Sequence, residues 1–274
     1  MLKMIRQLLF VLLVLVPTSL HAQTLYNETL GNFPGDQGWF LYLTNSPANA
    51  SQTYIPTQGT RLVTTNGASA GYFNTNPFTS SLVNPLFPTL DRTTGFSLSL
   101  DLLISSETHS SNDRAGFSII ALASDHHGIE LGFWNNQIWA QNDSPLFTHG
   151  EGAAFDTTTR TSYQLTILGN SYALFTNGNS ILTGSLRDYS SFGVPYSYNN
   201  FLFLGDDTSS ADADITLGRV TLSAVPEPAT WISLACAGFG AACWFRRRAR
   251  SACRSTTKSF CESGVMASNG VVRS

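Results

Sequence analysis

The clearest pattern along the chain is an alternation of apolar and polar residues between residues 96 and 104. Phe96, Leu98, Leu100, Leu102 and Ile104 are apolar, and polar residues occupy positions 97, 99 and 101. A period of two places successive side chains on opposite faces of a strand, so this segment predicts a β-strand with one buried face. Further apolar or alternating runs predict strands at 115–123, 129–134, 137–141, 163–168, 172–176, 181–186, 201–204 and 215–222.

Residues that tolerate a positive φ separate these runs. The dipeptides Asn66-Gly67, Asn135-Asn136, Gly169-Asn170 and Asn177-Gly178 predict tight hairpins. We find no convincing amphipathic helix between them. About ten to fourteen strands at hairpin spacing predict an all-β fold, a two-sheet antiparallel jelly-roll sandwich that forms one domain over residues 23–224.

A second pattern, near the C-terminus, predicts a membrane segment. Residues 229–245 form an uncharged apolar run of 17 residues, at the short end of the ~17 to 25 that cross a bilayer as a helix. Arg246, Arg247, Arg248 and Arg250 follow it. Arginines keep their flank in the cytoplasm, which places the preceding domain on the outer side.

Just before this run stands Val225-Pro226-Glu227-Pro228. The prolines cannot join a helix interior, so they predict an extended, accessible segment at the membrane surface. The order of motif, apolar helix and arginine cluster over residues 225–250 resembles the PEP-CTERM sorting signal of Gram-negative bacteria. The resemblance implies processing by an exosortase, a membrane-bound protease, and transfer to the cell surface. The alternative is a permanent single-pass anchor.

The two ends of the chain, residues 1–22 and 251–274, are not predicted to belong to the sandwich. Lys3 and Arg6 precede an apolar stretch over residues 8–16, which is typical of a signal peptide for the Sec export machinery, with cleavage expected after Ala22. Residues 251–274 add 24 residues without periodicity. We expect these residues to form a disordered cytoplasmic tail.

Charge and cysteine content restrict what the predicted domain can do. Residues 23–224 contain six arginines, no lysine and sixteen acidic residues, a net charge of −10. Such a domain repels nucleic acid and anionic membrane surfaces. All four cysteines lie at or after position 236, so no disulfide can stabilise residues 23–224 internally.

A second resemblance concerns the domain itself. The segments 114–120, 128–134 and 137–140, together with 200–207 and 215–222, are patterns of strand residues and glycine. They resemble the hairpins of concanavalin A-like, laminin G-type sandwiches, the lectin-like domains found in front of interchangeable C-terminal anchors. The resemblance implies the same two-sheet fold. It does not imply an activity, because this fold carries glycan binders, glycosidases and spacers.

Candidate catalytic residues are scarce. Glycoside hydrolysis needs two facing carboxyl groups about 5 to 10 Å apart. Glucanases of this fold carry three acidic residues at alternate positions of one strand, whereas Glu130 is the single acidic residue on its predicted strand. We therefore expect a protein without enzymatic activity.

Clustered aspartates suggest a metal site. Asp206 and Asp207 stand at a predicted strand end, and Asp212 and Asp214 follow after a short loop. Carboxylates with backbone carbonyls suit Ca²⁺, which takes ~6 to 8 oxygen ligands. The competing interpretation is that aspartate favours turns and keeps the surface soluble. No other cofactor is expected.

Sugar binding needs aromatic rings for stacking and polar groups for the hydroxyls. The candidate rings are Trp39, Tyr42, Trp134, Trp139, Tyr189, Tyr196 and Tyr198. Trp134, Tyr189, Tyr196 and Tyr198 are the predicted ligand-binding residues, and Tyr196 and Tyr198 are expected to be exposed. Phe117, Phe133 and Trp139 are expected in the core. We therefore expect an exported surface or matrix protein that binds or organises extracellular polysaccharide. The alternatives are a glycosidase-like enzyme and an adhesive protein–protein module.

Overall fold

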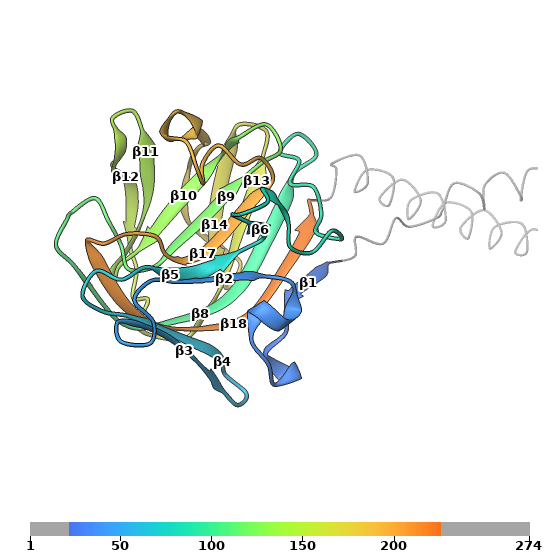
Figure 1. Cartoon of the computed structure of the whole chain (residues 1–274). Helices are drawn as coiled ribbons and strands as arrows, with labels where there is room; N and C mark the ends of the chain where they lie inside the picture. Colours follow the sequence, from blue (N-terminus) through green and yellow to red (C-terminus); the bar gives the residue numbers. More distant parts are fainter. Residues whose placement is uncertain (1–21, 226–274) are drawn as a thin grey trace, which may run out of the picture. The chain divides into compact units, whose positions relative to one another are not determined.

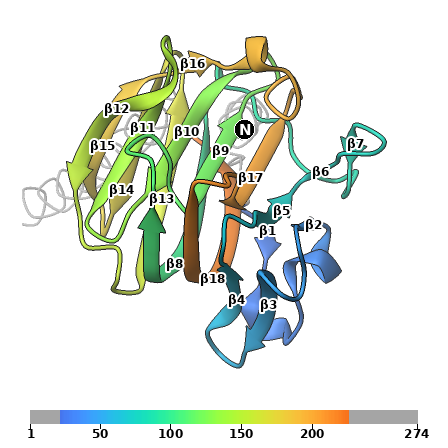
Figure 2. The same ribbon diagram turned by 60° about the vertical axis from the view of Figure 1, so that its left-hand side comes forward.

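A computed structural model describes residues 22–225 of the chain. Two eight-stranded antiparallel sheets face each other (Figures 1 and 2). The first sheet has the order β15 (Asn179–Ser185), β14 (Ser171–Thr176), β13 (Thr161–Leu168), β8 (Phe96–His109), β18 (Ala211–Ala224), β4 (Gly59–Thr64) and β3 (Ala50–Ile55), with β1 (Gln23–Tyr26) also paired to β18.

The second sheet and the loops beside it carry most of the predicted site residues. Its order is β12 (Leu146–Ala154), β11 (Gln137–Asp143), β10 (His127–Phe133), β9 (Ser118–Leu122), β17 (Phe201–Asp206), β5 (Ala70–Phe73) and β2 (Phe40–Leu43), with β16 (Arg187–Asp188) also paired to β10. A small hairpin of β6 (Thr75–Asn76) and β7 (Ser81–Leu82) stands apart from both sheets. Short 3₁₀ turns complete the described part: η1 (Glu28–Leu30), η2 (Pro34–Gln37) and η3 (Ser190–Phe192).

The all-β, two-sheet prediction is confirmed, and each predicted strand overlaps an observed one. One predicted turn has a different role. Asn66 and Gly67 have the expected positive φ angles of 55° and 66°, yet they join β4 of the first sheet to β5 of the second. Asn177-Gly178 does form a hairpin, between β14 and β15. Turn residues thus predict where the chain reverses but not which sheet it enters.

Several predictions fall on residues outside the described range. These are residues 1–21 of the expected signal peptide, the motif from Pro226 to Pro228, the membrane run 229–245, the arginines 246–248 and the tail 251–274. The last described residue, Val225, donates its backbone N–H to the Gly95 carbonyl oxygen at 3.1 Å. Within residues 22–225, no helix has the length and apolar character needed to cross a membrane.

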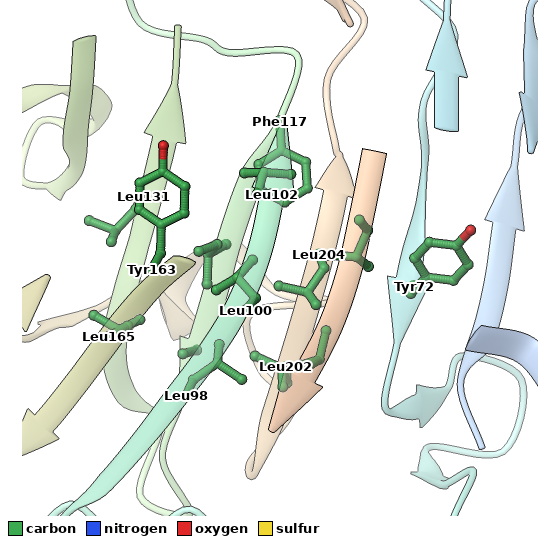
Figure 3. Packing of buried hydrophobic residues seen from close by; sticks show 14 of the residues in the cluster. Tyr72, Leu98, Leu100, Leu102, Phe117, Leu131, Tyr163, Leu165, Leu202 and Leu204 are labelled. Atoms are coloured by element: carbon green, nitrogen blue, oxygen red, sulfur yellow. The ribbon is translucent and has the colours of Figure 1, made fainter. Parts of the chain in front are cut away.

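The main core lies between the sheets and follows from strand alternation. Leu98, Leu100 and Leu102 of β8 point towards Leu131 of β10 and Leu204 of β17 (Figure 3). Their side chains are at most 2% exposed. Register reinforces the layer, because Leu98 of β8 pairs with Leu165 of β13 and with Leu222 of β18. A continuous apolar sheet face results, and its burial is the main stabilising contribution.

The second sheet is also covered on its outer face. Ile120, Leu122, Phe201 and Phe203 alternate with core residues and pack there against Phe147, Tyr189 and Tyr196. The covering residues come from β12 and from the segment between β16 and β17, residues 189–200. We call this segment the covering loop. It gives β9 and β17 two buried faces, which explains why their sequences read as continuous apolar runs.

We predict that Leu98→Ala lowers the free energy of unfolding by about 2 to 5 kcal/mol, because a fully buried leucine leaves a cavity between two sheets that cannot close completely. Urea unfolding of the purified chain measures the change. Leu168→Ala on β13 is the matched control, since Leu168 is 45% exposed, and its effect should stay within about 0.5 kcal/mol. If the two variants lost the same amount of unfolding free energy, the packing described above would be wrong.

Candidate functional site

The outer face of the second sheet gathers most of the predicted site residues. Glu130 lies on β10, and its neighbours Ile129 and Leu131 face the main core. The alternation therefore turns Glu130 outward, under the covering loop, where it is 0% exposed. Its Oε2 atom lies 2.5 Å from the Tyr196 hydroxyl. A carboxyl group in this position needs compensation for its lost hydration.

Compensation comes from several elements but remains incomplete. Arg114 Nη1 lies 3.9 Å from Glu130 Oε1, which is beyond hydrogen-bond distance, and that oxygen has no hydrogen-bond partner among the described residues. Burial, followed by the nearby charge of Asp207, raises the pKa of Glu130 to about 8. The carboxyl is therefore mainly protonated at neutral pH.

Tyr196 connects Glu130 to a second acidic residue. Its hydroxyl lies 3.1 Å from Oδ2 of Asp207, the residue directly after β17. Burial also raises the pKa of Asp207. A phenol has one proton to donate, so it cannot satisfy two ionised carboxylates at once. The Tyr196 hydroxyl thus links the covering loop to both Glu130 and Asp207.

Two of the three tyrosines of the covering loop, Tyr189 and Tyr196, are buried. Tyr189 is 0% and Tyr196 is 3% exposed. Tyr189 donates its hydroxyl proton to the Gln141 carbonyl oxygen at 2.6 Å. The expected exposure of Tyr196 is therefore wrong, because its ring and that of Phe147, with centroids 5.0 Å apart, seal the outer sheet face.

Trp134 lies half-buried directly after β10. Its indole N–H donates to the Arg114 carbonyl oxygen at 2.8 Å, and its ring stacks on His109 with centroids 4.0 Å apart and planes 8° apart. One face of the indole is thus occupied within the protein. Trp139 stacks in the same way on His149, at 4.1 Å. Phe117 and Phe133 are buried in the main core, as expected, whereas Trp139 is buried outside both core clusters.

The four predicted calcium ligands face different partners. Asp206 accepts a hydrogen bond from the Thr64 hydroxyl at 2.6 Å, and burial raises its pKa to about 9. Asp207 contacts Tyr196 as described above. Asp212 accepts the Gly67 N–H at 2.9 Å, and Asp214 pairs with Arg61 at 2.5 Å. Within residues 22–225, no group of three His, Cys, Asp or Glu side chains is arranged to hold a metal ion.

Tyr198 lies at a different kind of place, the wall of an open pocket of about 290 Å³. Four parts of the chain form this pocket: the β6–β7 hairpin, the segment between β7 and β8, the turn after β9 and the end of the covering loop. The lining residues are Thr75, Ser80, Leu82, Thr89, Ser124, Tyr198, Asn199 and Asn200. None of them is charged, and six besides Tyr198 carry a hydroxyl or amide, of which the Asn200 amide is bonded to backbone groups.

Asn200 fixes the shape of the pocket. Its Oδ1 atom accepts the Leu90 N–H at 2.5 Å and its Nδ2 atom donates to the Pro88 carbonyl oxygen at 3.3 Å. Its φ angle is +55°, a conformation that asparagine tolerates better than most residues. Asn199 is exposed. Of the pocket residues, sequence reasoning identified only Tyr198, because the others are hydroxyl and amide residues common in any loop.

Comparison with known proteins identifies the end of the chain. The family model described as the PEP-CTERM protein-sorting motif matches residues 224–250. The chain carries a PEP-CTERM sorting motif. PEP-CTERM proteins are exported and sorted to the cell surface, and the motif implies processing by an exosortase. Among curated proteins, none matches the sequence.

Solved structures identify the fold of the body in front of the motif. A carbohydrate esterase of the Shiga toxin-encoding bacteriophage phi24B is similar with a TM-score of 0.51 and 12% identity, over 75% of this chain and 100% of that chain. The sandwich has the concanavalin A-like fold. At this identity, the likeness shows the fold alone.

Two further structures are similar at lower scores. The exoplasmic/lumenal domain of VIP36, in its Ca2+/Man2-bound form, has a TM-score of 0.45 and 11% identity, over 76% of this chain and 92% of that chain. A sialidase has a TM-score of 0.43 and 11% identity, over 70% of this chain and 17% of that chain.

The raised pKa of Glu130 predicts how stability depends on pH. A carboxyl whose pKa is raised by folding stabilises the protein fully below its ordinary pKa near 4.5, and this contribution is lost as pH rises through about 8. In the unmodified chain, ionisation of Glu130 should lower the free energy of unfolding by up to about 1.4 kcal/mol per pH unit between pH 5 and 8. Glu130→Gln should remove this decline. Urea unfolding at several pH values measures it.

The matched control is Asp156→Asn. Asp156 is exposed, and hydrogen bonds from Thr158 lower its pKa. Its contribution is present above the ordinary carboxyl pKa and is lost as pH falls, so this variant should leave the range from pH 6 to 8 unchanged. A stability profile of Glu130→Gln that runs parallel to that of the unmodified chain would show that Glu130 is ionised in the fold.

Proposed function

We propose that this PEP-CTERM protein is displayed at the cell surface or in the extracellular matrix, where it binds polysaccharide without catalysing a reaction. The observation that supports binding most directly is the uncharged pocket beside Tyr198. An aromatic wall with hydroxyls and amides around it is the composition expected of a sugar site. The acidic body favours uncharged sugars over anionic ones.

A glycosidase-like enzyme on the same fold is the alternative. Glu130 and Asp207 lie close together, and Glu130 has the raised pKa that a general acid needs. However, Tyr196 lies within hydrogen-bond distance of both carboxyls, and neither acidic residue lines the pocket. This burial favours a structural role for the pair, in holding the covering loop.

Polysaccharide purified from the matrix of the producing cells is the probe for the proposed binding. We predict that Tyr198→Ala weakens its binding by about tenfold, equivalent to ~1.4 kcal/mol, because the stacking surface is lost. Tyr198→Phe is the matched control, since it keeps the ring and removes only the hydroxyl that donates to the Pro77 carbonyl oxygen. Affinity electrophoresis compares the variants. If both bind like the unmodified protein, the pocket is not the site.

Sorting has a separate test. Intact-mass analysis of protein from the culture medium and from membranes should find a mature species that begins near Gln23 and ends near Pro226. Glu227→Ala should shift the protein to a membrane-held form that keeps residues 229–274, because the protease would no longer recognise the motif. If the unmodified chain is found only in that uncleaved form, the segment is a permanent anchor.

A further inference from the structure

Four aromatic residues, two of them exposed, form a strip at one edge of the second sheet. Phe40 and Tyr42 lie on β2, Phe73 lies on β5, and Phe78 lies in the turn between β6 and β7. We call these four residues the aromatic strip. Strand alternation explains their direction: Leu41, Leu43 and Tyr72 pack with the main core, so the residues between them face outward.

The rings of the strip contact one another. Phe40 and Phe73 are paired across the strands and stack with centroids 6.2 Å apart. Tyr42 stacks on Phe73 at 5.7 Å, and Phe78 meets Phe40 edge-on at 5.8 Å. The four side chains therefore make one continuous aromatic surface.

This surface is partly open to solvent, since Phe40 and Phe73 are half-buried and the other two residues are exposed. The side chain of Phe78 is 85% exposed and that of Tyr42 is 39% exposed. Farther along the same sheet face, equivalent aromatic residues are buried by the covering loop. The hairpin that carries Phe78 projects beyond the sandwich (Figure 2). Clustered exposed aromatic residues of this kind mark interaction surfaces.

The aromatic strip is continuous with the uncharged pocket. The hairpin that presents Phe78 also supplies Thr75, Ser80 and Leu82 to the pocket. On the sheet, Phe73 contacts Phe201 with centroids 5.8 Å apart, and Phe201 contacts Tyr198 at the same distance. Phe201 is 0% exposed, so these rings connect pocket and strip beneath the surface, and the hairpin is the part that joins the two surfaces.

We propose that the aromatic strip is a second subsite, so that pocket and strip together bind an extended chain of uncharged sugar residues. This inference rests on the proposed function and specifies its ligand. The pocket supplies hydrogen-bonding groups for one end of the bound segment, and the strip supplies rings that stack on the apolar faces of the following sugars.

Charge on both surfaces favours this ligand. None of the eight pocket residues and none of the four strip residues carries a charge. Residues 23–224 have no lysine and a net charge of −10, so an anionic polymer would be repelled. An uncharged polysaccharide presents hydroxyls and apolar ring faces, which match the pocket and the strip respectively.

Binding of polysaccharide fragments of increasing length tests the proposal. The probe is matrix polysaccharide from the producing cells, partly hydrolysed and separated by size. The unmodified chain should bind longer fragments at least about tenfold more tightly than the shortest fragment that binds. Phe78→Ala and Tyr42→Ala should abolish this gain and leave the shortest fragment's affinity unchanged, whereas Tyr198→Ala should weaken all lengths. Both strip residues are exposed, so neither truncation should disturb the core.

Leu30→Ala is the control, because Leu30 is 62% exposed and lies in η1, which is not part of the strip. A gain with length that survives in both strip variants overturns the second subsite while leaving the pocket intact. If the unmodified chain binds no fragment, the proposed function itself fails, and the second subsite with it. Sedimentation adds an independent outcome: a self-associated chain that Phe78→Ala makes monomeric would assign the strip to a protein contact and overturn the proposal.

Discussion

The second sheet has apolar side chains on both of its faces, and most of the structure follows from the need to bury them. Every residue of β9 and β17 is buried. The first sheet covers the inner face. The outer face needs a separate cover, and residues 189–200 with Phe147 provide it at one end of the sheet. Where this cover ends, towards β5 and β2, the aromatic face continues into solvent. The proposed binding surface lies at this boundary.

Polar contacts hold the covering loop as well as its aromatic rings do. These contacts require the burial of a carboxyl group, which costs free energy. Glu130 is fully buried, and its Oε1 atom has no hydrogen-bond partner among the described residues. Keeping the carboxyl protonated is the way to avoid a buried unpaired charge. Tyr196 then bridges Glu130 and Asp207. Glu130, the acidic residue considered as a catalytic candidate, thus has a structural role. The same contacts position Tyr198, which follows Tyr196 by two residues in the covering loop.

Sequence reasoning found the fold where local pattern carries the information. β8 alternates over most of its length, and its partners β13 and β18 have similar runs, so the first sheet was predictable from these strands. The strands before residue 75 were missed. β2 and β5 are short, and β3 is mostly half-buried, so their apolar periods are too weak to recognise. Asn66-Gly67 was recognised as a turn, but the sheet that follows it depends on contacts far away in the sequence.

The candidate site was harder to predict, because it also depends on contacts between residues far apart in the sequence. The pocket combines residues from 75 to 200, and no local motif connects them. Tyr196 and Tyr198 are near neighbours of the same residue type, yet one is buried against Glu130 and the other lines the pocket. Their difference is set by the partner that faces each ring. A sequence pattern could therefore name aromatic candidates for sugar binding, but the division between rings that seal the sheet and rings that face solvent required the structure.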